Sequence, residues 1–213
     1  MTIYHIPEET KAIIFDIDST LYTNAEFAKN QIDVQIEQFA KIKNLDPKTA
    51  NQMVVSYREE WSKLNAGKKR SLANTFIDLG ISIEQSIQMR KELINPEKYL
   101  FIDTKLAETL VELSKKFSLI CVTNNPVSAA RKILECLGVD MILPEIIGLD
   151  TFSISKPDVK MYELAAKRMN VKIENCISVG DRFDIDLAIP LEMGMGAILV
   201  DGVEDVYNLG NVI

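Results

Sequence analysis

The chain has 213 residues, of which 47% are hydrophobic and 26% charged, the balance of a soluble globular protein rather than of a disordered or collagen-like chain. Its 24 lysines and arginines against 31 aspartates and glutamates give a net charge of −7, which disfavours binding nucleic acid or an anionic membrane through bulk charge. The longest apolar run, residues 193–200, is far shorter than the about 20 residues that span a bilayer, and the N-terminus lacks a secretion pattern. We therefore expect a cytoplasmic protein without nucleic-acid or membrane partners, as a monomer or a homodimer.

The histidine and cysteine content narrows the possible chemistry. The single histidine, His5, precedes the first strong element, so a Ser-His-Asp triad and a histidine-rich zinc site both lack the parts they need. The three cysteines form no CxxC pair, and Cys121 and Cys176 lie inside apolar runs, so we expect reduced thiols in the core. Carboxylates, lysines and hydroxyls must therefore carry any catalysis.

Short apolar runs and helical patterns alternate along the chain. Buried parallel strands are predicted at residues 12–15, 119–122, 145–148, 176–179 and 197–200. Four helices are predicted between the first two strands. One spans 25–43, a second begins at 46–47, a third spans 72–80, and a fourth begins with the capping-box pattern at 82–85. Two later helices are predicted to begin at 125–126 and at 156–157. This order predicts an α/β fold, with a doubly wound parallel-sheet (Rossmann-like) core of residues 1–22 and 100–213 and an inserted helical cap domain of residues 23–99.

The second predicted helix carries a stripe of large side chains at helical spacing, formed by Met53, Tyr57, Trp61 and Leu64. Such a stripe could line a substrate pocket, but it is more often part of a hydrophobic core. We therefore expect it to pack inside the cap.

The strongest chemical signal follows the first strand, where the sequence is FDIDSTLY. Residues i and i+2 of an extended chain project to the same side, so Asp16 and Asp18 should stand together at the carboxyl end of the strand. Two close carboxylates repel each other unless one is protonated or a cation lies between them. An EF-hand is excluded, because Leu21 stands where that loop needs glycine and Phe27 where it needs glutamate.

Three further polar groups follow other predicted strands. Thr123 and Asn124 come directly after the strand at 119–122, and Lys156 lies in the sequence SKPD. Residues 180–186, with the sequence GDRFDID, follow the strand at 176–179. Because the carboxyl ends of parallel strands meet at one edge of a sheet, we expect these groups to converge on a single site.

In this order, DxDxT, Thr-Asn, Lys-Pro and GDxxxxD resemble the four motifs of the haloacid dehalogenase superfamily of phosphohydrolases, over residues 12–200. The insertion resembles the helical C1-type cap, and FDxDxTLY is similar to the branch of pyrimidine 5′-nucleotidases and phosphoglycolate phosphatases. The chain departs from the pattern at Ser19, where glycine or asparagine is commoner, at Arg182, where serine is frequent, and at Pro190 in the last helix. None of these changes removes a catalytic group.

The resemblance implies a Mg²⁺-dependent phosphoric monoester hydrolase that acts on a small phosphorylated metabolite, a nucleoside monophosphate or a sugar phosphate. Asp16 would attack phosphorus to form an aspartyl phosphate, and Asp18 would protonate the leaving oxygen and then activate water. Thr123 and Lys156 would act in catalysis by binding the phosphate, and Asn124 would also touch the substrate.

The resemblance also implies a metal site. Mg²⁺ would be held by Asp16, the backbone carbonyl of Asp18 and Asp181, with Asp186 acting directly or through water. Members of the superfamily use either GDxxxD or GDxxxxD spacing, so Asp184 competes with Asp186 for the last place. We favour Asp186, because the number of residues between it and Gly194, before the last strand, matches the spacing that is usual in the family.

Substrate choice would rest with the cap, because the core meets only phosphate. The basic run 68–70 could reach an anionic substrate, although such a run is more often a solvated helix start. Two other functions use the same motifs and stay open: a phosphomutase, and a non-catalytic module that binds phosphate esters.

Overall fold

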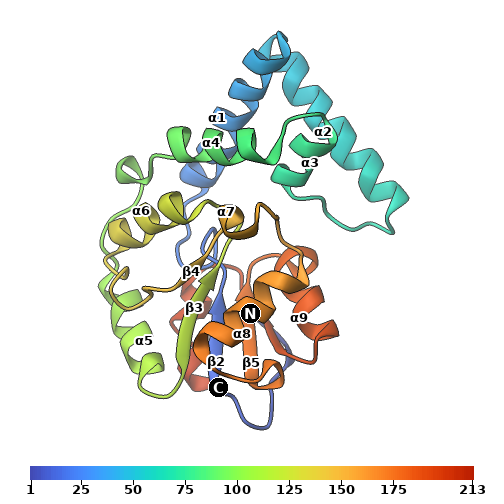
Figure 1. Cartoon of the computed structure of the whole chain (residues 1–213). Helices are drawn as coiled ribbons and strands as arrows, with labels where there is room; N and C mark the ends of the chain where they lie inside the picture. The colour runs from blue at the N-terminus through green and yellow to red at the C-terminus, as the bar shows by residue number, and fades with distance from the viewer.

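The computed structural model describes residues 1–213 and contains one six-stranded sheet in the order β1-β6-β5-β2-β3-β4 (Figure 1). The strands are β1 (Thr2–His5), β2 (Ala12–Phe15), β3 (Ser118–Val122), β4 (Ile146–Ile147), β5 (Cys176–Gly180) and β6 (Gly196–Leu199). Strands β2 to β6 pair in parallel, and β1 pairs antiparallel with β6 at one edge. The prediction of a doubly wound α/β fold is confirmed.

Strand β1 is the one strand that the sequence pattern did not indicate. All four of its side chains are exposed, so it has no buried side that would produce an alternating apolar pattern. It is held by pairing with β6 and by the Met1 ammonium group, which lies 2.7 Å from Asp205 and 3.1 Å from Asp201.

Helices cover both faces of the sheet. Those of the sheet layers are α5 (Thr104–Ser114), α6 (Val127–Leu137), α7 (Leu149–Phe152), α8 (Val159–Met169), α9 (Ala188–Glu192) and α10 (Val203–Val206). The shorter turns are η1 (Pro96–Lys98), η2 (Ile173–Asn175), η4 (Leu209–Asn211) and the π-helical η3 (Phe183–Leu187). In β2, Ile13 and Phe15 pack with α5, α6 and α10, whereas Ala12 and Ile14 pack with α8. Since successive side chains of a strand point to opposite faces, β2 is apolar throughout because both of its faces are buried.

Two helices begin slightly later than the sequence indicates. Helix α6 begins at Val127 rather than at Pro126, and the Val127 amide is capped by the Asp150 carboxylate at 2.9 Å. Helix α8 begins at Val159, with Asp158 as its N-cap, rather than at 156–157. Pro126 keeps an extended backbone, with φ −58° and ψ 149°, and precedes α6 instead of opening it. Asp158 follows Pro157 and caps α8 by accepting from the Lys160 backbone amide.

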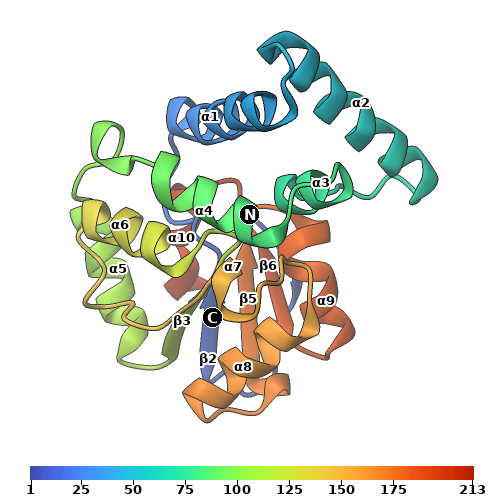
Figure 2. The same ribbon diagram turned by 45° about the horizontal axis from the view of Figure 1, so that its top comes forward.

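Four helices lie together above the carboxyl ends of the strands (Figures 1 and 2). They are α1 (Ala25–Lys43), α2 (Pro47–Leu64), α3 (Leu72–Asp78) and α4 (Ile83–Leu93), and α4 begins with the expected capping box. The rings of Phe39 and Phe76 stack with their centres 5.3 Å apart, inside a hydrophobic cluster that these helices form among themselves. No helix of the chain is both long and apolar enough to cross a lipid bilayer.

The expectation that the stripe on α2 packs inside the cap is wrong. Helix α2 buries only Ala50 and Val54, while Met53 is 41% exposed and Leu64 is 85% exposed. The C-terminal half of α2 extends beyond its neighbours (Figure 2), and no residue of α2 after Val54 is buried. Trp61 instead packs its ring against the Arg70 guanidinium, 5.1 Å from the ring centre.

Candidate active site

A buried lysine joins the ends of β2 and β3 to the η3 turn. The Lys156 ammonium group donates to Asp16 Oδ1 at 2.6 Å, to Asp186 Oδ1 at 2.7 Å and to the Val122 carbonyl at the end of β3 at 2.8 Å. Asp16 follows β2 directly, and its amide donates to the Val179 carbonyl of β5, which continues the sheet pairing. Burial alone would lower the pKa of Lys156, but the adjacent Asp16 and Asp186 carboxylates raise it above its usual value.

Three carboxylates gather at this point. One oxygen each from Asp16, Asp181 and Asp186 lies within 4.8 Å of the other two. Burial raises the pKa of Asp16 to about 7, with the Lys156 charge opposing this shift and the Asp186 charge adding to it. Burial likewise raises the pKa of Asp181, against the charge of Arg182.

These groups suit a hard divalent cation. Asp181 Oδ1 is buried without a hydrogen-bond partner, and its nearest cation, Arg182 Nε, lies 3.5 Å away. Carboxylate oxygens are the ligands that Mg²⁺ prefers, and a cation between these three would offset charge that Lys156 and Arg182 together do not balance. The donor set and the unpartnered oxygen of Asp181 therefore fit a metal site.

The turn after β5 holds Asp186 against the strand. Ser178 Oγ and the Tyr162 hydroxyl donate to the Asp186 carbonyl at 2.8 and 3.1 Å, and the Arg182 amide donates to Asp186 Oδ2 at 3.0 Å. A Cβ placed on Gly180 would lie 2.5 Å from Asp186 Cβ, closer than real Cβ contacts. The glycine of GDRFDID is therefore needed to let Asp186 approach.

Asp184 lies outside the carboxylate cluster. Its Oδ2 accepts a 3.0 Å hydrogen bond from the backbone amide of Lys69. In the same basic run, the Arg70 side chain pairs with Asp78 at 2.8 Å. The run 68–70 thus forms a contact between the helical layer and η3, beside a second cavity that Asp184 also lines.

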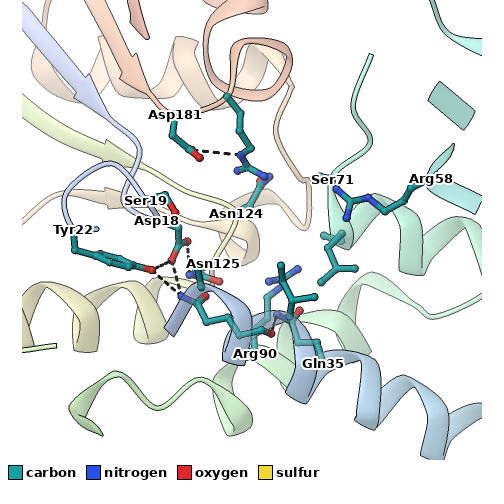
Figure 3. A pocket seen from close by; sticks show the side chains of 16 residues that line it. Asp18, Ser19, Tyr22, Gln35, Arg58, Ser71, Arg90, Asn124, Asn125 and Asp181 are labelled. Atoms are coloured by element: carbon teal, nitrogen blue, oxygen red, sulfur yellow. Dashed lines mark hydrogen bonds and ion pairs between the residues drawn. The ribbon is translucent and has the colours of Figure 1, made fainter. Parts of the chain in front are cut away.

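Asp18 is fixed by donors from three parts of the chain (Figure 3). Its Oδ1 accepts from the Tyr22 hydroxyl at 2.6 Å and from Gln31 Nε2 of α1 at 3.0 Å, and its Oδ2 accepts from Asn125 Nδ2 at 2.8 Å. Sequence reasoning did not single out Gln31 or Asn125. Two signals in the sequence could have indicated them: Asn125 directly follows the Thr-Asn pair, and Gln31 is a polar residue on the inner face of an amphipathic helix.

Thr123 and Asn124, in the loop after β3, make different contacts. Thr123 is fully buried, and its hydroxyl oxygen accepts from the Asn125 amide at 3.1 Å. Asn124 Oδ1 accepts from the Lys156 backbone amide at 2.6 Å, which ties the loop after β3 to the segment that carries the lysine. The structure therefore brings all the sequence-predicted site residues except Asp184 to the carboxyl edge of the sheet.

A cavity of about 280 Å³ separates this edge from the four helices above it. On the core side it is lined by Asp18, Ser19, Asn124, Asn125, Asp181 and Arg182. On the helical side it is lined mainly by Gln31, Gln35, Arg58, Ser71 and Arg90 (Figure 3). No local signal in the sequence indicates Arg58 and Arg90, because each lies on a charged helix whose direction depends on the packing of α1 to α4.

The family model of haloacid dehalogenase-like hydrolases matches residues 10–194. The chain therefore belongs to the haloacid dehalogenase-like hydrolase family, and the family resemblance deduced from the four motifs is confirmed.

Individual relatives agree with this assignment. The chain is 27% identical over 205 residues to a glyceraldehyde 3-phosphate phosphatase of Methanothermobacter thermautotrophicus, covering 90% of this chain and 85% of the relative. It is 28% identical over 187 residues to a phosphoglycolate phosphatase of Colwellia psychrerythraea, covering 82% and 77%. The crystal structure of the HAD-hydrolase YfnB from Bacillus subtilis superimposes with a TM-score of 0.60 at 15% identity, covering 96% of this chain and all of that one, and shows the shared fold.

Proposed function

We propose that the chain is a Mg²⁺-dependent phosphatase that hydrolyses a small phosphorylated metabolite, a nucleoside monophosphate or a sugar phosphate, through an aspartyl-phosphate intermediate. The observation that carries the proposal is the contact of Asp16 with Lys156 at the end of β2, beside Asp181 and Asp186 and two residues before Asp18. The relatives named as phosphatases support the same reaction class.

Asp16 would be the nucleophile. Attack of its carboxylate on phosphorus forms a new P–O bond and breaks the bond to the leaving oxygen, and water then cleaves the aspartyl phosphate. Lys156 would hold Asp16 in place and bind an oxygen of the phosphate, together with Thr123 and Asn124. The bound Mg²⁺, held by Asp16, the Asp18 carbonyl, Asp181 and Asp186, would supply positive charge against the phosphate.

Asp18 would move the protons. Its carboxyl group faces the cavity and is held by Tyr22, Gln31 and Asn125, so its position is set before the substrate arrives. It would give a proton to the leaving oxygen in the first step and take one from water in the second. Three hydrogen bonds to one carboxylate restrict its rotation, which favours a defined transfer geometry.

Residues 23–99 would form a cap domain that closes over the core of residues 1–22 and 100–213. Two contacts across this division support the proposal. Ser71 Oγ lies 3.1 Å from Ser155 Oγ, and Lys91 Nζ lies 2.9 Å from Asp150 Oδ2. Closure of this kind would exclude water during the first step.

The test is phosphate release from p-nitrophenyl phosphate by the purified protein with and without Mg²⁺, followed by a panel of nucleoside monophosphates and sugar phosphates. Release that needs Mg²⁺ and is lost in Asp16→Asn supports the proposal. Asp33→Asn, which removes a surface charge paired with Lys29 on α1, is the matched control and should keep full activity. Retention of phosphate on a bisphosphate product would indicate a mutase, and tight ester binding without turnover would indicate a binding module.

A further inference from the structure

Arg90, on α4, is a buried cation without an acceptor. Its side chain lines the cavity above the catalytic edge and is only 6% exposed. It makes no hydrogen bond or ion pair within the chain, and its Nε is buried without a partner. Figure 3 shows it on the helical side of the cavity, across from Asp18 and Asp181.

A second arginine on the same side lacks a carboxylate partner. Arg58, on α2, also lines the cavity and donates only to the backbone carbonyl of Arg70, at 3.2 Å. Arg70 itself shows the ordinary arrangement, because its guanidinium is paired with both oxygens of Asp78. Arg58 and Arg90 are therefore the two cap arginines whose charges face the cavity without an ion pair.

Burial of these charges is costly for the free protein. Burial lowers the pKa of Arg90 to about 10, with the charge of Asp18 opposing the shift, and it also lowers the pKa of Arg58. Buried charges are normally paired, so an unpaired buried guanidinium indicates that its partner arrives with a ligand. Guanidinium groups bind carboxylates and phosphates with two parallel hydrogen bonds, so the missing partner is anionic.

The proposed mechanism gives the cleaved phosphate other partners. This phosphate must reach Asp16 and Lys156 at the core side, whereas Arg58 and Arg90 come from helices on the opposite side of the cavity (Figure 3). The third arginine of the lining, Arg182, belongs to the core and faces Asp181 and Asp186. The cavity thus has arginine side chains on its helical side as well as on its core side.

We propose that the substrate carries a second anionic group, a carboxylate or a second phosphate, and that Arg58 and Arg90 bind it at the cap side of the cavity. This inference rests on the proposed phosphatase function and narrows its substrate class, away from nucleoside monophosphates and toward small phosphate esters that carry a second anion. In a cavity of about 280 Å³ both anions would belong to one small molecule, which selects short phosphorylated acids or bisphosphates over phosphate esters with a neutral tail.

The first experiment compares kcat/KM for three phosphate esters. They are 2-phosphoglycolate, with a carboxylate, fructose 1,6-bisphosphate, with a second phosphate, and glycerol 3-phosphate, with no second anion. We expect at least one of the first two to exceed glycerol 3-phosphate by about tenfold or more, the effect of one charge-assisted hydrogen bond. Which one does so distinguishes a carboxylate from a second phosphate.

The variants Arg90→Met and Arg58→Met test the residues. Each should reduce the preference for the two-anion ester over glycerol 3-phosphate by about tenfold, and Arg90→Lys should restore part of it. Lys48→Met removes an exposed charge from the same helix as Arg58 and should leave the preference unchanged. In the absence of ligand, Arg90→Met should melt no lower than the wild type, because it removes an unpaired buried charge, whereas a structural arginine would destabilise when removed.

Two results would overturn the proposal. One is a wild-type enzyme that hydrolyses glycerol 3-phosphate as well as both two-anion esters; the other is a preference that Arg58→Met and Arg90→Met leave intact. If no ester is hydrolysed, the phosphatase function fails, and the subsite is then tested by thermal stabilisation, which needs no turnover. Greater stabilisation by 2-phosphoglycolate or fructose 1,6-bisphosphate than by glycerol 3-phosphate, lost in Arg90→Met, would still support the subsite, and equal stabilisation would refute it.

Discussion

The ammonium group of Lys156 lies 2.6 Å from Oδ1 of Asp16, although the two residues are 140 positions apart in the chain. Both side chains are almost completely buried, at 1% and 2% exposure. A buried ion pair contributes little net stability compared with an apolar pair, but removal of one partner leaves an uncompensated charge. Lys156 is therefore a sensitive position of the proposed site, because two buried carboxylates share its charge.

We predict that Lys156→Met destroys activity and destabilises the metal-free protein. Phosphate release should fall at least about 100-fold, and the free energy of unfolding should fall by about 3–5 kcal/mol, because Asp16 and Asp186 lose their shared cation. Mg²⁺ should restore part of the stability by supplying charge to the same carboxylates. Phosphate-release assays and thermal melts with and without Mg²⁺ measure both effects.

The matched control is Lys160→Met, which removes an exposed lysine on α8 that makes no ion pair. It should retain wild-type turnover and melting temperature. If Lys156→Met melted like Lys160→Met and still released phosphate, the role of Lys156 in both packing and catalysis would be wrong.

Tyr22→Phe should slow the chemical step without weakening substrate binding. The Tyr22 hydroxyl donates to Asp18 at 2.6 Å and accepts from Gln31 at 2.8 Å, so its loss frees one side of the Asp18 carboxylate. We expect kcat to fall by about tenfold with KM little changed, the effect of one hydrogen bond to a charged group. Steady-state kinetics on p-nitrophenyl phosphate give both constants.

Tyr207→Phe provides the comparison for that variant. Its hydroxyl also donates to a carboxylate at 2.6 Å, that of Asp103, but this pair lies away from the proposed catalytic groups, at the start of α5. This variant should lose stability and keep kcat. Equal kcat values in the two variants would show that the hydroxyl of Tyr22 does not position Asp18.

Stabilisation by Mg²⁺ should grow as the pH rises from 5.5 to 8. The pKa of Asp16 is raised by burial to about 7, above the about 3.9 of an unfolded aspartate. The metal-free native state therefore binds more protons than the unfolded state between these values, so its stability falls as the pH rises through this window. A metal ion competes with the proton for the same carboxylate, so Mg²⁺ binds better once Asp16 is charged.

Melting temperatures with and without Mg²⁺ at pH 5.5 and pH 8 measure this dependence. Titration calorimetry in two buffers of different ionisation enthalpy counts the protons that Mg²⁺ releases near pH 6. Asp16→Asn, which cannot titrate at this position, should release fewer protons. A Mg²⁺-induced shift of the same size at both pH values would argue against a metal at Asp16.

Much of the core could be predicted because local signals determine it. Short apolar runs separated by helical patterns indicate a parallel sheet, and the carboxyl ends of its strands meet at one edge, so Asp16, Thr123 and Asp181 had to converge. Strand β1 lacked such a signal, because its side chains are exposed and only pairing with β6 makes it a strand.

The cap side of the cavity could not be predicted in the same way. Arg58 and Arg90 lie on separate helices, and no pattern along the chain places them on one cavity. Their positions depend on how α1 to α4 pack over the sheet, which involves side-chain fit rather than periodicity. For the same reason the sequence pattern predicts a buried stripe at Met53 and Leu64, whereas both are exposed: the pattern does not show where a covering helix ends.

The last two aspartates of GDRFDID should behave differently when each is changed to asparagine. Asp186 is 1% exposed, accepts from Lys156 at 2.7 Å and lies with Asp16 and Asp181, whereas Asp184 accepts only from the Lys69 amide at 3.0 Å. Asp186→Asn should raise the Mg²⁺ concentration needed for half-maximal activity by about tenfold or more, because it removes a carboxylate from the cluster. Asp184→Asn should leave this concentration unchanged, since an amide oxygen still accepts from Lys69. Mg²⁺ titrations of both variants with p-nitrophenyl phosphate make the comparison, and the reverse order would move the last metal carboxylate to Asp184.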